Sequence, residues 1–227
     1  MRTRINGFTL IEIAIVLVIV GLLLGGVLKG QEMIRAAQVR NLISEQQGIK
    51  AAFYGFQDRY RSLPGDYASA NSNINCGATA CRNGDGNGRI EIHNAAGIHE
   101  STIVWSQLAA AGFLNGSYDP AGADNEPDDT NSPKNPYSIF LQLAYDDNYG
   151  AGTLPSKHNL KTGGQIPAAL IAEVDRKIDD GLPYGGSFQF SPYAPTGSTA
   201  PTAAACITGT AWNILGEESN CAGASLF

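Results

Sequence analysis

The stretch that decides the fold is "INGFTLIEIAIV" (residues 5–16), which places one acid, Glu12, in an otherwise uncharged and mostly apolar run. Glu12 is the only charged residue between Arg4 and Lys29. Residues 8–28 form a 21-residue run, which at about 1.5 Å per residue covers the roughly 30 Å hydrocarbon core of a bilayer. The sequence therefore predicts a transmembrane helix here. A carboxylate inside such a helix costs about 2.5–3.5 kcal/mol on insertion scales, so Glu12 is expected to have a function.

The distribution of charge predicts the orientation of this helix. Arg2 and Arg4 precede the run, whereas the whole chain carries a net charge of −6 from 15 basic and 21 acidic residues. The positive-inside rule therefore places the N-terminus in the cytoplasm and the rest of the protein outside. Since an acidic chain repels phosphate backbones, nucleic acid is not expected as a partner. A cleaved secretory signal is disfavoured because the run is too long and lacks a small-x-small site.

The helix is predicted to continue well past the membrane. Apolar residues recur at steps of three and four, and no proline interrupts them before "SLPGD" (62–66). Because the residue before a proline is biased away from helix, we expect one helix over residues 9–61, roughly 80 Å long, whose second half, 29–61, is amphipathic. The buried stripe is predicted to contain Val39, Leu42, Gln46, Ile49, Phe53, Phe56 and Tyr60.

The residues "GFTLIEI" (7–13), behind a short basic leader, resemble the prepilin cleavage motif of type IV pilins and of type II secretion pseudopilins. The resemblance implies that residues 1–7 are a leader, that a prepilin peptidase cuts after Gly7, and that Phe8 becomes an N-methylated terminus. It implies as partners the peptidase/N-methyltransferase, an inner-membrane assembly platform, membrane lipid and other copies of the chain in a fibre.

For Glu12 the resemblance implies a role in assembly. Glu12 of an incoming subunit would neutralise the Phe8 amine of its neighbour within an apolar bundle. The alternative is that Glu12 only offsets its own terminal amine and the helix dipole, an effect worth about 0.3–1 kcal/mol.

The head, residues 62–227, is predicted to be small, loop-rich and of mixed structure. Short helices are expected within 100–114 and 166–181, and strands within 137–145 and 186–193. The resemblance implies a pilin-like α+β fold, in which the long helix packs on a small antiparallel sheet with a disulfide-bonded periphery.

Four cysteines lie in this head, at Cys76, Cys81, Cys206 and Cys221. Because the head is expected in an oxidising compartment, disulfides are the predicted use, and three connectivities are possible. The local pairs 76–81 and 206–221 are favoured, and many pilins close a C-terminal loop in the second way. A zinc site is disfavoured, since neither pair has the usual ligand spacing twice over.

The turn "NGDGNGRIE" (83–91) is a possible calcium loop. Asn83, Asp85 and Asn87 alternate as oxygen ligands do in an EF-hand, and Glu91 follows nearby. The second half of the loop does not match, because Asn94 occupies the position that should hold a bidentate Glu. A turn rich in Gly, Asn and Asp also needs no metal to form, so a bare turn stays open as the alternative.

The predicted function is a structural subunit of a type IV pilus or pilus-like fibre, held in the bacterial inner membrane before assembly with its head in the periplasm. A type II secretion pseudopilin is the alternative within the family. A signal-anchored periplasmic binding module or enzyme is the alternative outside it. No catalytic motif surrounds the three histidines, His93, His99 and His158, which are expected to be solvated, so the chain is not expected to be an enzyme.

Overall fold

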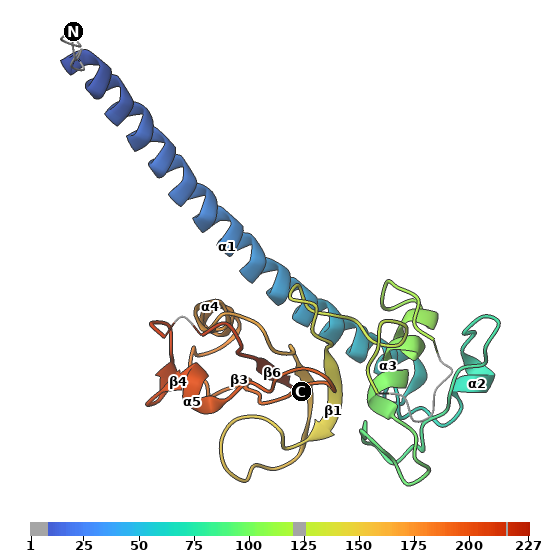
Figure 1. Ribbon diagram of the computed structural model, residues 1–227. Coiled ribbons are helices and arrows are strands. Elements are labelled where there is room, and N and C mark those ends of the chain that lie inside the picture. The colour runs from blue at the N-terminus through green and yellow to red at the C-terminus, as the bar shows by residue number, and fades with distance from the viewer. Residues whose placement is uncertain (1–8, 120–125, 217) are drawn as a thin grey trace. The chain divides into compact units, whose positions relative to one another are not determined.

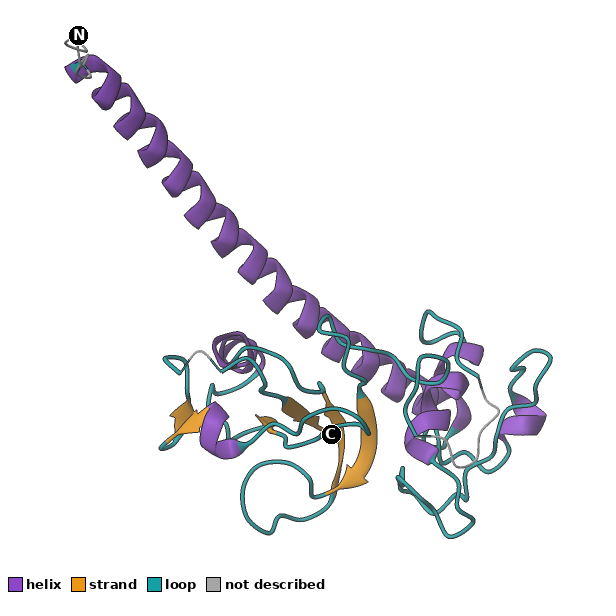
Figure 2. Cartoon of the chain, in the orientation of Figure 1, coloured by secondary structure: helices purple, strands orange, loops and turns teal. Residues whose placement is uncertain are grey.

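The computed structural model describes residues 9–119, 126–216 and 218–227. The chain forms two compact units, Met1–Gln38 and Val39–Phe227, and each is described by itself. Figure 1 shows the elements in chain order, and Figure 2 shows how much of the second unit consists of loops. The second unit, which contains the head, combines helices with small antiparallel sheets, so the α+β class is confirmed.

The first helix, α1, spans Leu10–Tyr60, within one residue of the predicted bounds at each end. In the first unit its large apolar side chains are exposed all round, as expected of a helix whose solvent is lipid or other helices. From Val39 onward α1 buries one stripe instead. The predicted stripe residues Val39, Leu42, Gln46, Ile49, Phe53 and Phe56 are all buried, and Tyr60 is half-buried.

Two apolar clusters lie in succession along this stripe. The first joins Val39 and Leu42 to α4, Ala168–Ile178, and to Phe188. The second joins Ile49, Phe53 and Phe56 to α3, Glu100–Ala110, and to Leu143 and Leu160. The second half of α1 is therefore held by side-chain burial rather than by helix propensity alone.

The main sheet has four antiparallel strands in the order β1-β2-β6-β3. Leu143, Leu160, Ser225 and Phe188 are successive partners across it and share one face. The strands are β1 Gln142–Asp146, β2 Lys157–Lys161, β3 Phe188–Phe190 and β6 Gly223–Leu226, with β4 Ile207–Thr208 and β5 Ala211–Trp212 forming a separate pair.

The predicted strand at 137–145 is partly wrong, because β1 begins only at Gln142. Asn135 forms a turn before it, since its Oδ1 accepts hydrogen bonds from the N–H groups of Tyr137 and Ile139. Ser138 within this turn has φ 65°, a left-handed backbone that no strand residue adopts. The apolar alternation that predicted a strand thus also covers this turn. Alternation alone does not distinguish the turn from a strand.

The predicted helices form, with slightly shorter bounds. α3 is followed by Gly112 at φ 82°, and α4 follows Pro167 and is followed by Gly181 at φ 79°. Such glycines end helices because they take the left-handed conformation without a Cβ clash. Two further single-turn helices are α2, Ala70–Asn73, and α5, Ala203–Cys206.

Two disulfides tie the head together. Cys76 is bonded to Cys81, and Cys206 is bonded to Cys221, which are the two local pairs favoured from the sequence. The second bond is fully buried within the cluster around α4, so it supports the core as well as closing a loop.

Candidate functional site

The first candidate site is the start of α1, where Glu12 forms a hydrogen-bonded cap. Its Oε2 accepts hydrogen bonds from the Thr9 backbone N–H at 2.8 Å and from the Thr9 hydroxyl at 2.7 Å. The Glu12 N–H donates in return to Thr9 Oγ1 at 3.3 Å. This is a capping box, in which two residues three apart satisfy each other's free donors at a helix start. The predicted cleavage pair, Gly7 and Phe8, lies outside the described residues.

The apolar surface that follows the cap is the second feature of this site. Among the described residues α1 is the one helix long and apolar enough to cross a membrane. Its most apolar 18-residue segment is wholly unburied. An exposed apolar surface of this extent indicates a membrane or a protein partner. Beyond it, Lys29 pairs with Glu32 at 2.7 Å, so charge returns to the helix as the apolar run ends.

The second candidate site is the acidic loop, where the predicted calcium ligands come together only in part. Asn83 Oδ1 accepts a hydrogen bond from the Asn71 N–H at 2.8 Å. Asn87 Oδ1 accepts from the Arg89 N–H, while its Nδ2 links Asp85 to Glu91. Both asparagine oxygens thus accept hydrogen bonds within local turns, and calcium binding by Asn83, Asp85, Asn87 and Glu91 stays a prediction.

Asp85 lies in a group with two acids that the spacing in the sequence did not indicate. Carboxylate oxygens of Asp66, Asp85 and Glu100 all lie within 4.8 Å of one another. Asp66 ends the "LPGD" turn after α1, and Glu100 begins α3, so three distant segments meet. Their positions were no guide to this site, because acids are common both after a tight turn and in the first turn of a helix.

Backbone N–H groups hold the two buried carboxylates in place. Asp66 accepts from the N–H groups of Asn87 at 3.0 Å and Gly88 at 2.9 Å. Glu100 accepts from those of Asp85 and Glu91, both at 3.0 Å. The segments are packed so closely here that a Cβ on Gly84 would lie 2.3 Å from a backbone oxygen, at Gly65, which explains why the loop carries glycine at position 84.

The electrostatics of the cluster leave negative charge uncompensated. The exposed fractions of Asp66 and Glu100 are 2% and 0%. Burial raises the pKa of Glu100 to about 7 and also raises the pKa of Asp66, against the opposing effect of the N–H donors. In the described part of the chain neither acid forms an ion pair with a basic side chain. Three carboxylates with this spacing are the hard oxygen ligands that Ca²⁺ prefers.

A further acidic group, Asp175, Asp179 and Asp180, has a structural use. Asp175 accepts from Trp212 Nε1 at 2.7 Å, and Asp179 accepts from the N–H groups of Ser187 and Phe188. These bonds tie the end of α4 to β3 and to the loop closed by Cys206–Cys221.

The histidines depart from the expectation that all three are solvated. His99 is buried directly before α3, and His158 is half-buried on β2 against Phe53 and Tyr145, whereas His93 is exposed. Burial lowers the pKa of His158, so this ring is held in its neutral form.

Comparison with known proteins bears on the first site. Residues 2–28 match the family model described as the prokaryotic N-terminal methylation motif. The chain carries the type IV pilin and pseudopilin signature. Neither curated proteins nor solved structures gave a match. With α1, this signature indicates a membrane-anchored precursor that a prepilin peptidase processes, and the α+β head with its two disulfides is consistent with a pilin-like fold.

Proposed function

We propose that this protein is a structural subunit of a type IV pilus or pilus-like fibre, assembled through α1. The observation that carries the proposal is the coincidence of the pilin signature at residues 2–28 with an unburied helical segment apolar enough to cross a membrane. In the membrane this surface would contact lipid, and in a fibre it would contact the same helix of neighbouring subunits. Arg2 and Arg4 favour a cytoplasmic N-terminus, and two disulfides suit a head on the oxidising side.

A pseudopilin of a type II secretion system is the second candidate, since it would carry the same signature and the same helix. A signal-anchored binding module or enzyme is less favoured, because it would give no use to the Gly7–Phe8 junction or to Glu12. Co-purification distinguishes the first two: a pilus subunit is recovered in sheared surface fibres, whereas a pseudopilin stays in the cell envelope.

Processing is the first test of this proposal. In a host with prepilin peptidase the mature protein is expected to begin with N-methylated Phe8, and Gly7→Ser is expected to keep the seven-residue leader. Intact mass and N-terminal sequencing measure both. A wild-type protein that keeps Met1 in such a host would exclude a processed fibre subunit.

The proposal includes calcium as a stabilising ligand of the head, at Asp66, Asp85 and Glu100 with Glu91 at the edge. A divalent cation would offset the carboxylate charge that burial leaves uncompensated. Millimolar CaCl₂ at neutral pH is expected to raise the melting temperature of the wild type and to leave Asp66→Asn unchanged. Asp129→Asn, an exposed acid outside the cluster, is the matched control and is expected to respond as the wild type does. Equal melting temperatures with CaCl₂ and with EDTA would remove calcium from the proposal.

A further inference from the structure

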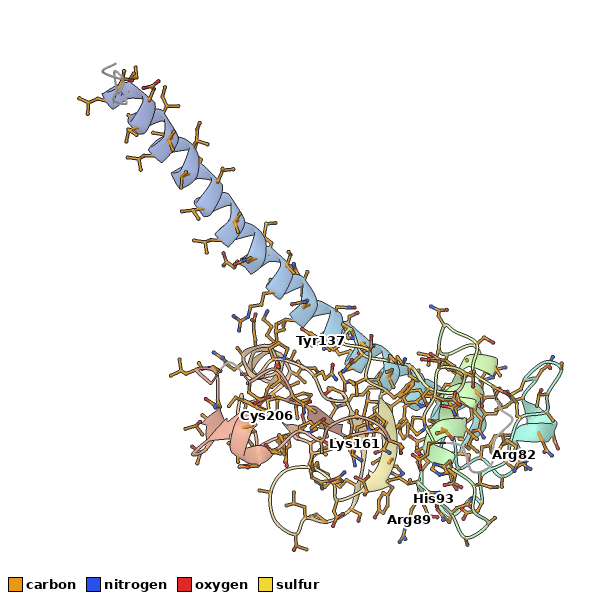
Figure 3. The ribbon with its side chains drawn as sticks, viewed as in Figure 1. Arg82, Arg89, His93, Tyr137, Lys161 and Cys206 are labelled. Atoms are coloured by element: carbon orange, nitrogen blue, oxygen red, sulfur yellow. A yellow bond between two sulfur atoms is a disulfide. The ribbon has the colours of Figure 1, made fainter. Side chains whose placement is uncertain are left out.

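Lys161, labelled in Figure 3, is a buried lysine. Its amine lies between an amide and a carboxylate. It ends β2, its exposed fraction is 0%, and it is the direct register partner of Gln142 on β1. Its Nζ donates a hydrogen bond to Gln142 Oε1 at 2.7 Å and another to the Asp146 carboxylate. Gln142 is itself 6% exposed, so the amine and the amide meet away from bulk water.

This environment shifts the protonation equilibrium of Lys161 toward the neutral amine. Burial lowers the pKa of Lys161 and outweighs the nearby carboxylate of Asp146, which raises it. A desolvated lysine with a lowered pKa is a nucleophile, as in lysine-dependent covalent catalysis. Asp146 is oriented to exchange a proton with it, because Asn159 Nδ2 donates to Asp146 Oδ1 at 2.9 Å and leaves Oδ2 for the amine.

From this arrangement we infer that Lys161 and Gln142 form an intramolecular amide cross-link between β2 and β1, with Asp146 carrying the proton. The cross-link joins the two strands at directly opposed residues, so it closes the β1–β2 hairpin covalently at the end away from its loop. It lies beyond the fibre proposal and does not depend on it.

The reaction balances without an oxidant or any co-reactant. Asp146 takes a proton from the Lys161 ammonium, which leaves an amine and a carboxylic acid. The amine nitrogen bonds to Cδ of Gln142, and the carbonyl electron pair moves onto Oε1. As the carbonyl re-forms, the Cδ–Nε2 bond breaks, the acid protonates Nε2, and the carboxylate takes the surplus proton from the attacking nitrogen. The products are a secondary amide and ammonia, which carries away the remaining proton as ammonium and leaves Asp146 ionised.

Geometry and mass action favour the forward direction. One amide replaces another, so the bond energies nearly cancel, whereas well-oriented intramolecular reactions reach effective molarities on the order of 10⁵–10⁸ M. Gln142 and Tyr193 also line a surface cavity of about 300 Å³, which gives ammonia a route to solvent. Once ammonia is diluted, the reverse reaction lacks its nucleophile.

The test is mass spectrometry of the full chain, purified in detergent and reduced to open both disulfides. The folded wild type is expected to weigh less than its processed sequence by one ammonia. A tryptic digest is expected to contain one branched peptide that joins the segment of Gln142 to that of Lys161. The same chain kept in denaturant from synthesis onward is expected to show the full mass and to lose ammonia after refolding.

Three variants and one control assign the roles. Lys161→Arg keeps a cation but offers no nucleophilic amine, and Gln142→Met keeps the size but offers no carbonyl, so both are expected to keep the full mass. Asp146→Asn is expected to lose the cross-link, whereas Asp147→Asn, the exposed neighbour, is expected to keep it. A protease-resistant, folded wild type with the full mass and two separate peptides would overturn the inference and leave Lys161 and Asp146 as a buried ion pair.

Discussion

At the residue scale, Glu100 makes the head sensitive to pH. Its folded pKa is about 7, mainly because it is buried, against an ordinary value of 4.5. Between these values the unfolded chain has released its proton and the folded chain has not, so stability is expected to fall as pH rises from about 4.5 to about 7. At about 1.4 kcal/mol per unit, the loss is on the order of 3 kcal/mol. Urea unfolding of the detergent-solubilised protein in EDTA measures it.

The control for Glu100 is chosen from the same loop. Glu100→Gln removes one ionisation and is expected to reduce the slope of unfolding free energy against pH, and the raised pKa values of Glu45 and Asp175 account for the slope that remains. Glu91→Gln changes a partly exposed acid at the edge of the cluster and is expected to keep the wild-type slope. An unchanged slope in Glu100→Gln would place the pH sensitivity elsewhere in the head.

The group of Asp66, Asp85 and Glu100 shows which part of this site the sequence predicts. Alternating oxygens indicated the segment that contributes Asp85 to the acidic group, because ligand spacing along one loop is visible in the sequence. Asp66 and Glu100 are 34 residues apart and meet only through the packing of α3 against the turn after α1. No local pattern encodes that contact, so two of the three carboxylates could be found only from the fold.

At the element scale, periodicity predicted helices well and strands less well. α1 and α4 have apolar stripes and clear stop signals, Pro64 for α1 and Gly181 for α4, which fix their ends. β2 and β6 were not predicted, because β2 (KHNLK) lacks an apolar alternation and β6 (GASL) is short and made mostly of small residues. Both strands are determined by their partners in the sheet rather than by their own propensity.

The two disulfides close loops of different length, so removing each should lower the free energy of unfolding by a different amount. Chain-entropy estimates assign about 2 kcal/mol to the 5-residue separation of Cys76–Cys81 and about 3 kcal/mol to the 15-residue separation of Cys206–Cys221. Replacing both cysteines of each pair by serine, followed by urea unfolding, is expected to give the larger loss for the second pair, which is also fully buried. The opposite order would contradict the chain-entropy account of these two bonds.

At the scale of the whole molecule, one part of the chain suits lipid or other helices as its surroundings and the other part suits water. The apolar part of α1 is insoluble in water, whereas the head is acidic and loop-rich and buries its own core. Glu12 lies where these demands conflict, since its charge costs free energy in the membrane. Its capping box with Thr9 shows one use for the carboxylate within a single subunit. The fibre proposal requires a second use between subunits.

Two substitutions separate these uses. Glu12→Leu removes both the charge and the cap, and it is expected to insert into the membrane at least as well as the wild type, because about 2.5–3.5 kcal/mol of insertion cost is gone. Glu12→Gln removes the charge but keeps the cap, since glutamine also completes a capping box. If pairing with the Phe8 amine of a neighbour drives assembly, both variants reach the membrane and neither forms fibres, because that amine would enter an apolar bundle without a counter-charge. The measurement compares membrane-fraction protein with sheared fibres in a strain that lacks the native subunit. Normal fibres from Glu12→Gln would show that the cap alone is needed, and charge pairing between subunits would then be excluded.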